Sequence, residues 1–128
     1  MKDHPKIWVR GREVRHPAVD VWRVMRCTIG FGVEKDKQNN PVGYVPTLER
    51  EILNRAIAEF GGATIIPVIG GWNSPTNGPV IEHGRILQID NVPYADLYRA
   101  RAFAGYVKDL LRQESVVYSV QNVEADFI

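Results

Sequence analysis

The chain has 128 residues, of which 45% are hydrophobic and 24% charged, and its 16 Lys and Arg nearly balance 15 Asp and Glu. These proportions are those of an ordinary globular protein, and the length suits one domain with a core that needs no metal or disulfide. The formal net charge of +1 gives no electrostatic reason to expect a nucleic acid or an anionic membrane as partner.

Cysteine content and hydropathy bear on location. Cys27 is the only cysteine, so no intrachain disulfide can form, which fits a reducing compartment. The first four residues are polar, and no apolar run approaches the roughly 20 residues needed to cross a bilayer. We therefore expect a cytoplasmic protein without a membrane partner.

The first part of the chain, residues 1–20, is predicted to be an N-terminal arm, and residues 21–128 the folded domain. Ile7–Val9 could form a short edge strand, but Gly11 and Pro17 interrupt regular structure there. Arms of this kind fold only against a partner or remain disordered when alone.

The first core strand is predicted at Val21–Gly32, where residue types alternate. Arg26 has the parity opposite to the apolar residues, and burying an unpaired guanidinium would be costly, so it should reach solvent, a carboxylate or an anionic ligand. Cys27 is expected to be a buried structural thiol rather than a nucleophile. The apolar face of the strand comprises Met25, Cys27, Ile29 and Phe31.

The rest of the chain predicts two amphipathic helices and three more strands. The helices are expected at about 47–60 and 94–112. The apolar stripe of the first helix is predicted to comprise Leu48, Ile52, Leu53, Ala56, Ile57 and Phe60. Between them, the apolar runs Ala63–Trp72 and Val80–Ile89 flank the turn-rich stretch Asn73–Pro79, a pattern typical of an antiparallel hairpin. Pro67 favours an edge strand or a bulge, because it lacks a backbone donor. A last strand follows from about residue 116.

The element order is therefore β-α-β-β-α-β. It predicts an α+β sandwich of ferredoxin-like type, with both helices on one face of a four-stranded antiparallel sheet. The opposite face would be left open for a dimer interface or a ligand cleft. The polar connection Glu34–Val45 and the hairpin loop would border such a cleft.

No familiar catalytic or metal signature is present. The sequence lacks GxxxxGK[ST], GxGxxG and GxSxG, and its three histidines have no metal-ligand spacing. We therefore expect no cofactor and no metal, and the sequence favours a protein without catalytic activity over an enzyme.

The hairpin carries most of the candidate ligand-binding side chains. His83 and Arg85 share one face of a strand, where His83 could act as base or acid and Arg85 could clamp an anion; alternatively they form a solvent-facing strip. Trp72 could stack on a flat ligand beside polar groups, or simply anchor its loop. The candidate set is Arg26, Trp72, Asn73, His83 and Arg85.

The stretch GGWNSPTNGPVIEHGRILQI, with LRQESVVYSV and a closing DF, resembles a family of small uncharacterised bacterial proteins of ferredoxin-like fold. In that family a G-x-W precedes the turn, a Gly lies in the turn, and Q-E precedes the last strand. The resemblance covers roughly residues 22–128 and implies the fold but no activity. The matching positions are Gly70, Trp72, Gly78, Gln113 and Glu114.

Three functions remain open. The first is a homo-oligomeric protein that binds a nucleotide-like or other anionic small molecule, with sequestration of that molecule as its role. The second is a cofactor-free isomerase or monooxygenase of the dimeric α+β-barrel type, with His83 as its base or acid. The third is a protein-interaction module without a small ligand. Nucleic acid is the weakest candidate partner, because the net charge is close to zero.

Overall fold

A computed structural model of the chain describes residues 7–9, 12–14, 23–33 and 46–124. The predicted loop Glu34–Val45, the end of the chain after Glu124 and much of the predicted N-terminal arm lie outside these residues. The elements are, in chain order, β1 (Ile7–Val9), β2 (Arg12–Val14), β3 (Arg23–Gly32), α1 (Pro46–Phe60), β4 (Thr64–Ser74), β5 (Gly78–Val92), a 3-10 turn η1 (Tyr94–Asp96), α2 (Leu97–Leu110) and β6 (Val117–Glu124).

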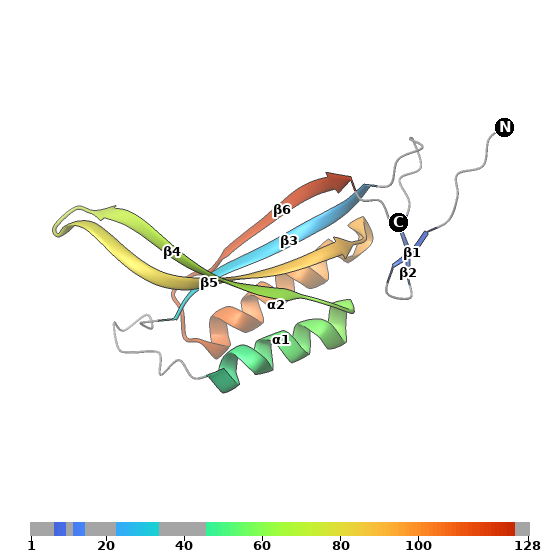
Figure 1. Cartoon of the computed structure of the whole chain (residues 1–128), viewed down its shortest axis with the longest axis horizontal. Coiled ribbons are helices and arrows are strands. Elements are labelled where there is room, and N and C mark those ends of the chain that lie inside the picture. The colour runs from blue at the N-terminus through green and yellow to red at the C-terminus, as the bar shows by residue number, and fades with distance from the viewer. Residues whose placement is uncertain (1–6, 10–11, 15–22, 34–45, 125–128) are drawn as a thin grey trace.

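Four strands form one antiparallel sheet in the order β4-β5-β3-β6. Both helices lie on the same side of this sheet, as Figure 1 shows. The ferredoxin-like α+β arrangement expected from the sequence is thereby confirmed. Pro67 lies on β4, which is an edge strand as predicted, because an edge can tolerate a residue that donates no hydrogen bond.

The core lies between the sheet and the helix pair. The alternation in β3 has the predicted consequence, because Cys27 and Ile29 are fully buried under the helices. On the helix side, Ile52 and Ala56 of α1 are also fully buried, but Ile57, which we expected on the same stripe, is 43% exposed. The helix rests on a single sheet, so only a narrow stripe of its surface is covered. From α2 the buried residues are Ala100, Phe103, Ala104 and Val107.

Local sequence explains where α1 begins and ends and where α2 begins. Helix α1 begins at Pro46, whose missing N–H costs nothing at the first helical position, and it carries Glu49 in its first turn. It stops at Phe60, after which Gly61 takes a left-handed φ of 86° and donates its N–H to the Ile57 carbonyl. The predicted second helix is shorter than expected, because its first turn is the separate 3-10 element η1.

The β4–β5 hairpin is longer than predicted. Both strands continue through most of the expected loop, and the register runs to the pair Ser74↔Gly78. The Ser74 hydroxyl accepts hydrogen bonds from the backbone N–H groups of Thr76 and Asn77, and Gly78 supplies the left-handed φ of 69° that closes the turn.

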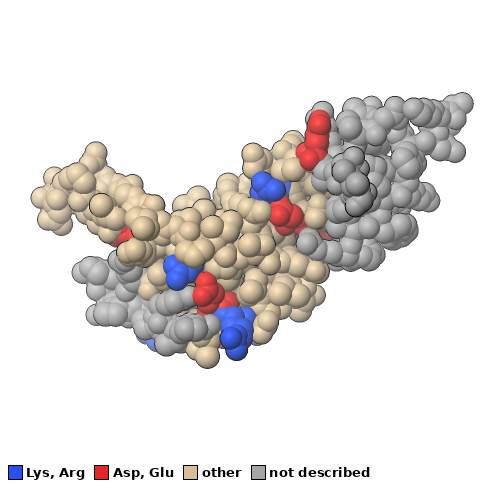
Figure 2. Space-filling model, viewed as in Figure 1, with Lys and Arg blue, Asp and Glu red and all other residues tan. Residues whose placement is uncertain are grey.

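Strand β3 accompanies β5 only as far as the pair Gly32↔Gly84. Beyond that point β4 and β5 pair with each other, from Ile69↔His83 to Ser74↔Gly78, and no third strand among the described residues joins them. This two-stranded part, residues 69–83, is called the hairpin arm below. It projects away from the helices in Figure 1, and its outer part shows no charged side chain in Figure 2.

Near the N-terminus, β1 pairs with β2 in antiparallel register, from Ile7↔Val14 to Val9↔Arg12. The strand expected at Ile7–Val9 is present, whereas its partner β2 was not predicted. The domain boundary at residue 20 remains a prediction.

Candidate functional site

A pocket of about 450 Å³ lies where the hairpin arm leaves the sheet. We call it the arm-base pocket. Its walls come from the end of β3, from both strands of the hairpin and from the segment leading into β6. The lining residues are Gly30, Phe31, Gly32, Val68, Gly70, Gly71, Trp72, Glu82, His83, Gly84, Arg85, Ile86, Gln113, Ser115 and Val117.

Glycines shape this pocket. A Cβ on Gly84 would lie 2.9 Å from the Phe31 carbonyl oxygen, so only glycine lets β5 approach β3 this closely. A Cβ on Gly32 would lie 3.3 Å from the Gln113 Oε1 atom and would narrow the space beside that amide. Glycine here therefore combines close backbone approach with open volume.

Arg85 is held in place by the helix layer. Its Nε donates to the Glu49 Oε1 atom on α1 at 3.1 Å, and a terminal nitrogen donates to the Gly84 carbonyl at 2.9 Å. Because successive strand residues face opposite sides, Arg85 has the same parity as the buried Leu87 and lies on the helix side of the sheet. Its positive charge is thus already matched by a carboxylate.

Arg26 lies on the other face of the sheet. Its Nε donates to the Asp90 Oδ1 atom at 2.6 Å, and the Gln88 Nε2 atom donates to the second Asp90 oxygen at 2.9 Å. Of the three environments expected for Arg26, which were solvent, a carboxylate and an anionic ligand, the structure shows a carboxylate, and the resulting polar cluster lies on the open face. The cluster contains no residue of the arm-base pocket.

The structure therefore brings together three of the five candidate residues. Trp72, His83 and Arg85 line the arm-base pocket, while Arg26 and Asn73 do not. The ligand-binding role of all five remains a prediction. The predicted contribution of Glu34–Val45 lies outside the described residues.

Three polar pocket residues were absent from the candidate set: Glu82, Gln113 and Ser115. The ion-pair partner of Arg85, Glu49, was also missed. The available signal was the density of glycines inside strands, since Gly70, Gly71 and Gly84 each suggest a close approach or an open space. The Gln113 position had been noted only through the family resemblance.

The Tyr118 hydroxyl and the Cys27 thiol, which lie within the core, have no feature of a catalytic acid, base or nucleophile. The Tyr118 hydroxyl lies 3.3 Å from the Leu97 carbonyl oxygen and 3.7 Å from the Cys27 sulfur, so it faces the helices. Burial, followed by the hydrogen bond with Cys27, raises the pKa of Tyr118 to about 12. Burial also raises the pKa of the Cys27 thiol, which keeps it protonated and unreactive at neutral pH.

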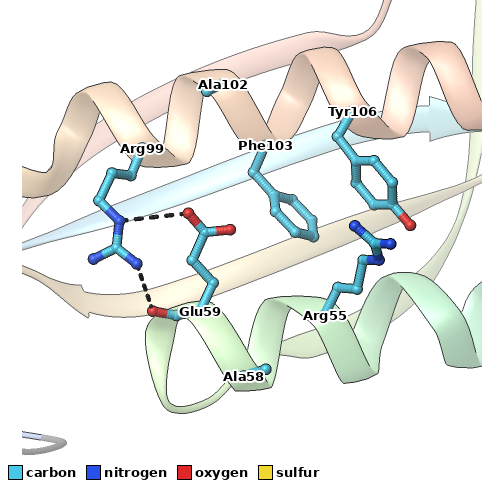
Figure 3. A pocket seen from close by; sticks show the side chains of 7 residues that line it. All are labelled: Arg55, Ala58, Glu59, Arg99, Ala102, Phe103 and Tyr106. Carbon is cyan, nitrogen blue, oxygen red and sulfur yellow. Dashed lines mark hydrogen bonds and ion pairs between the residues drawn. The ribbon is translucent and has the colours of Figure 1, made fainter.

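A second pocket, also about 450 Å³, lies between the two helices (Figure 3). Arg99 of α2 reaches across it to α1, with its Nε 3.4 Å from the Glu59 Oε1 atom and a terminal nitrogen donating to the Glu59 carbonyl at 3.0 Å. At the other end, the Arg55 guanidinium carbon lies 4.8 Å from the centre of the Tyr106 ring. These contacts join the two helices to each other. This structural role accounts for the polar residues of the second pocket without a ligand.

Neither a membrane helix nor a metal cluster is found in the described part of the chain. None of its helices has the length and hydropathy of a membrane span. Among residues 7–9, 12–14, 23–33 and 46–124, no three His, Cys, Asp or Glu side chains gather as a metal site would require.

Fold and pocket together define a small ferredoxin-like α+β protein with a cavity beside a long hairpin. No protein-family model and no curated protein matches the sequence. Among solved structures, a phage SAM lyase in its apo state is similar, with a TM-score of 0.59, 16% identity, and coverage of 81% of this chain and 86% of that one.

Two further structures share the fold. A phage SAM lyase in complex with S-methyl-5'-thioadenosine has a TM-score of 0.55 and 16% identity, with 82% of this chain and 92% of that chain covered. CutA from Synechococcus elongatus has a TM-score of 0.54 and 7% identity, with 80% and 78% covered. At these identities the similarity shows a shared fold alone.

Proposed function

We propose that this chain is an oligomeric small-molecule binding protein whose ligand is a nucleoside-type molecule held in the arm-base pocket. The observation that carries the proposal is the pocket itself, which is lined by one large aromatic residue and several polar residues. Its volume of about 450 Å³ lies within the range of roughly 300–1,000 Å³ that small-molecule sites occupy.

Trp72 provides the surface on which a base could stack. Trp72 is 53% exposed and lines the pocket, so a flat ligand can reach it. Stacking of a nucleobase on an aromatic side chain contributes about 1–3 kcal/mol, and it tolerates any base because every base has a π-face.

The charges at the pocket favour an uncharged or positively charged nucleoside over a polyphosphate. Arg85 is paired with Glu49, so its positive charge is largely cancelled. Glu82 adds a further carboxylate at the wall, and Gln113 and Ser115 add neutral hydrogen-bonding groups. These groups suit ribose hydroxyls and a neutral base. The proposed ligand therefore differs in charge from the anionic small molecule expected from the sequence.

The similar structures support the ligand class. One of the phage SAM lyase structures holds S-methyl-5'-thioadenosine, a neutral thionucleoside, on a fold that this chain shares. We therefore take S-methyl-5'-thioadenosine as the first probe and ATP as its highly charged counterpart.

Isothermal titration calorimetry of the full chain tests this proposal. We expect the thionucleoside to bind and ATP to bind more weakly, and Trp72→Ala to raise the Kd of the thionucleoside by about tenfold or more. Tyr98→Ala is the matched control, because Tyr98 is a 72% exposed aromatic on α2 and is not part of the pocket. Absence of thionucleoside binding at millimolar concentration, or unchanged binding by Trp72→Ala, would refute the proposal.

A second candidate is a lyase-type enzyme acting on S-adenosylmethionine. The two similar phage structures favour it, as does the presence of Glu82 and His83 at one pocket. Either side chain could accept a proton. Incubation with S-adenosylmethionine, followed by chromatography for S-methyl-5'-thioadenosine, measures turnover. If the candidate is right, His83→Ala abolishes turnover while the thionucleoside still binds; lack of product from the wild-type chain rejects it.

A further inference from the structure

The hairpin arm has an unusual composition for an exposed segment. Charged residues make up 24% of the chain, yet none occurs in the 18 consecutive residues from Thr64 to Ile81. Beyond the pair Gly32↔Gly84 the arm has no third strand of the described sheet beside it. A two-stranded ribbon without a third strand or a packing layer is only marginally stable in water.

The arm carries large apolar side chains on both of its faces. Ile69 is 68% exposed and Ile81 is 73% exposed, and they lie on one face because the residue opposite Ile81 is Gly71, two positions from Ile69. Trp72, 53% exposed, lies on the other face. Apolar residues on both faces are typical of strands that are covered on both sides.

A matching surface lies at the opposite edge of the sheet. β6 is an edge strand, and no charged residue occurs from Ser115 to Val123. Val117 is 70% exposed and Val120 is 40% exposed. Proteins commonly protect such edges with lysines or other charges, and neither β4 nor β6 does so before Glu124.

We infer that the hairpin arm docks on the β6 edge of a second copy of this chain. Both surfaces carry a long uncharged stretch, interrupted only by Glu82 at the base of the arm and Glu124 at the end of β6. Each also offers exposed apolar side chains and unpaired strand backbone, and each chain supplies one of each. Two copies can therefore cover each other's arms reciprocally, or more copies can close a ring. The occupant is a second copy because the same chain presents both halves of the contact.

This inference rests on the oligomer in the proposed function but not on its ligand. Val117 also lines the arm-base pocket, so an arm docked at β6 would reach the mouth of the neighbouring pocket. The ligand could then be enclosed by two chains, although the assembly does not depend on it.

Sedimentation velocity of the full chain at micromolar concentration tests the contact. We expect the wild type to be oligomeric, and Ile81→Lys and Val117→Lys each to raise the association Kd by about thirtyfold or more. Tyr98→Lys, which places the same charge at an equally exposed aromatic on α2, should sediment as the wild type. A monomeric wild type, or an Ile81→Lys variant that associates as tightly as the wild type, would overturn the inference.

Mixing the two variants identifies the contacting surfaces. Ile81→Lys keeps an intact β6 edge and Val117→Lys keeps an intact arm, so an equimolar mixture should recover association that neither variant shows alone. If two arms contacted each other instead, mixing would restore nothing, and the inference would be wrong.

Hydrogen exchange of the wild type provides a readout that needs no variant. Arm and β6 amides should become more protected as protein concentration rises. Exchange that is independent of concentration would mean that the arm is not covered by a second copy. Titration with S-methyl-5'-thioadenosine in parallel separates failure of this contact from failure of the proposed ligand site.

Discussion

Strand β5 passes through two environments, and two of its isoleucines differ in exposure accordingly. Ile89 is fully buried beneath the helices, whereas Ile81, eight residues earlier on the same strand and of the same parity, is 73% exposed on the hairpin arm. Both isoleucines are paired in the sheet, Ile89 with Cys27 of β3 and Ile81 with Gly71 of β4. What differs is the layer over the strand: α1 and α2 cover one end and no described element covers the other (Figure 1).

The comparison indicates that the helix-covered region provides the stability of the fold, whereas the arm is available to interact with a partner or ligand. The helix-covered part holds the buried apolar core, and burial of apolar surface is the dominant favourable term in folding. The arm leaves its apolar side chains in water, which is the usual property of a surface that meets a partner or ligand. The arm-base pocket lies at the boundary between the two regions, where Gly84 joins them.

The largest difference is expected when the same type of substitution, Ile to Ala, is made separately in each region. Ile29→Ala should lower the free energy of unfolding by about 2–5 kcal/mol, because Ile29 is fully buried and its removal leaves a cavity. Ile81→Ala should change it by no more than about 0.5 kcal/mol when the chain is dilute and dissociated. Urea denaturation at low protein concentration measures both, and a cost for Ile81→Ala comparable to that for Ile29→Ala would contradict the contrast.

The junction between the regions can be tested with a matched pair of glycines. Gly84→Ala should destabilise the chain by about 1–3 kcal/mol, since the new methyl group would lie 2.9 Å from the Phe31 carbonyl oxygen and would force β5 away from β3. Gly70→Ala, on the arm, meets no atom within 4 Å and should stay within about 0.5 kcal/mol of the wild type.

Thermal or urea unfolding reports both variants. Equal stability of Gly84→Ala and the wild type would mean that the two strands can separate at this point without cost, and the close approach at Gly84 would not stabilise the junction.

The helix-covered region was largely predictable from the sequence, because its patterns have one interpretation. In β3 the alternation of Cys27, Ile29 and Phe31 predicts a single buried face, and a sheet with helices on one side has one such face. Pro67 correctly indicated an edge strand. Ile57 was assigned wrongly because the sequence does not specify how wide a stripe of α1 the sheet would cover.

The arm and the pocket were less predictable, for a physical reason. Apolar residues such as Ile69 and Ile81 follow the pattern of a covered strand, and the sequence does not say whether the cover belongs to the same chain. The pairing of Arg85 with Glu49 joins residues 36 positions apart on different elements, so no local spacing could indicate it. Parity did predict that His83 and Arg85 share a face, but not that Arg26 would lie on the opposite one.

The smallest expected effect concerns the alkaline limit of the helix-covered region. The pKa of Tyr118 is raised, chiefly by burial, from an ordinary value near 10 to about 12. The folded state therefore holds this proton more tightly than the unfolded state. The corresponding stability is fully present below about pH 10 and is lost as the pH rises toward 12. The raised pKa of the Cys27 thiol acts in the same direction.

Tyr118→Phe removes this ionisation together with the hydroxyl that meets the Leu97 carbonyl. At pH 8 the variant should be less stable by about 1 kcal/mol, but its urea midpoint should fall less than that of the wild type between pH 8 and pH 11. Ser119→Ala is the matched control, because it removes a neighbouring hydroxyl, hydrogen-bonded to Thr28, that does not titrate. Its cost should be the same at both pH values. A Tyr118→Phe midpoint that falls as steeply as the wild type would show that this phenol does not set the alkaline limit.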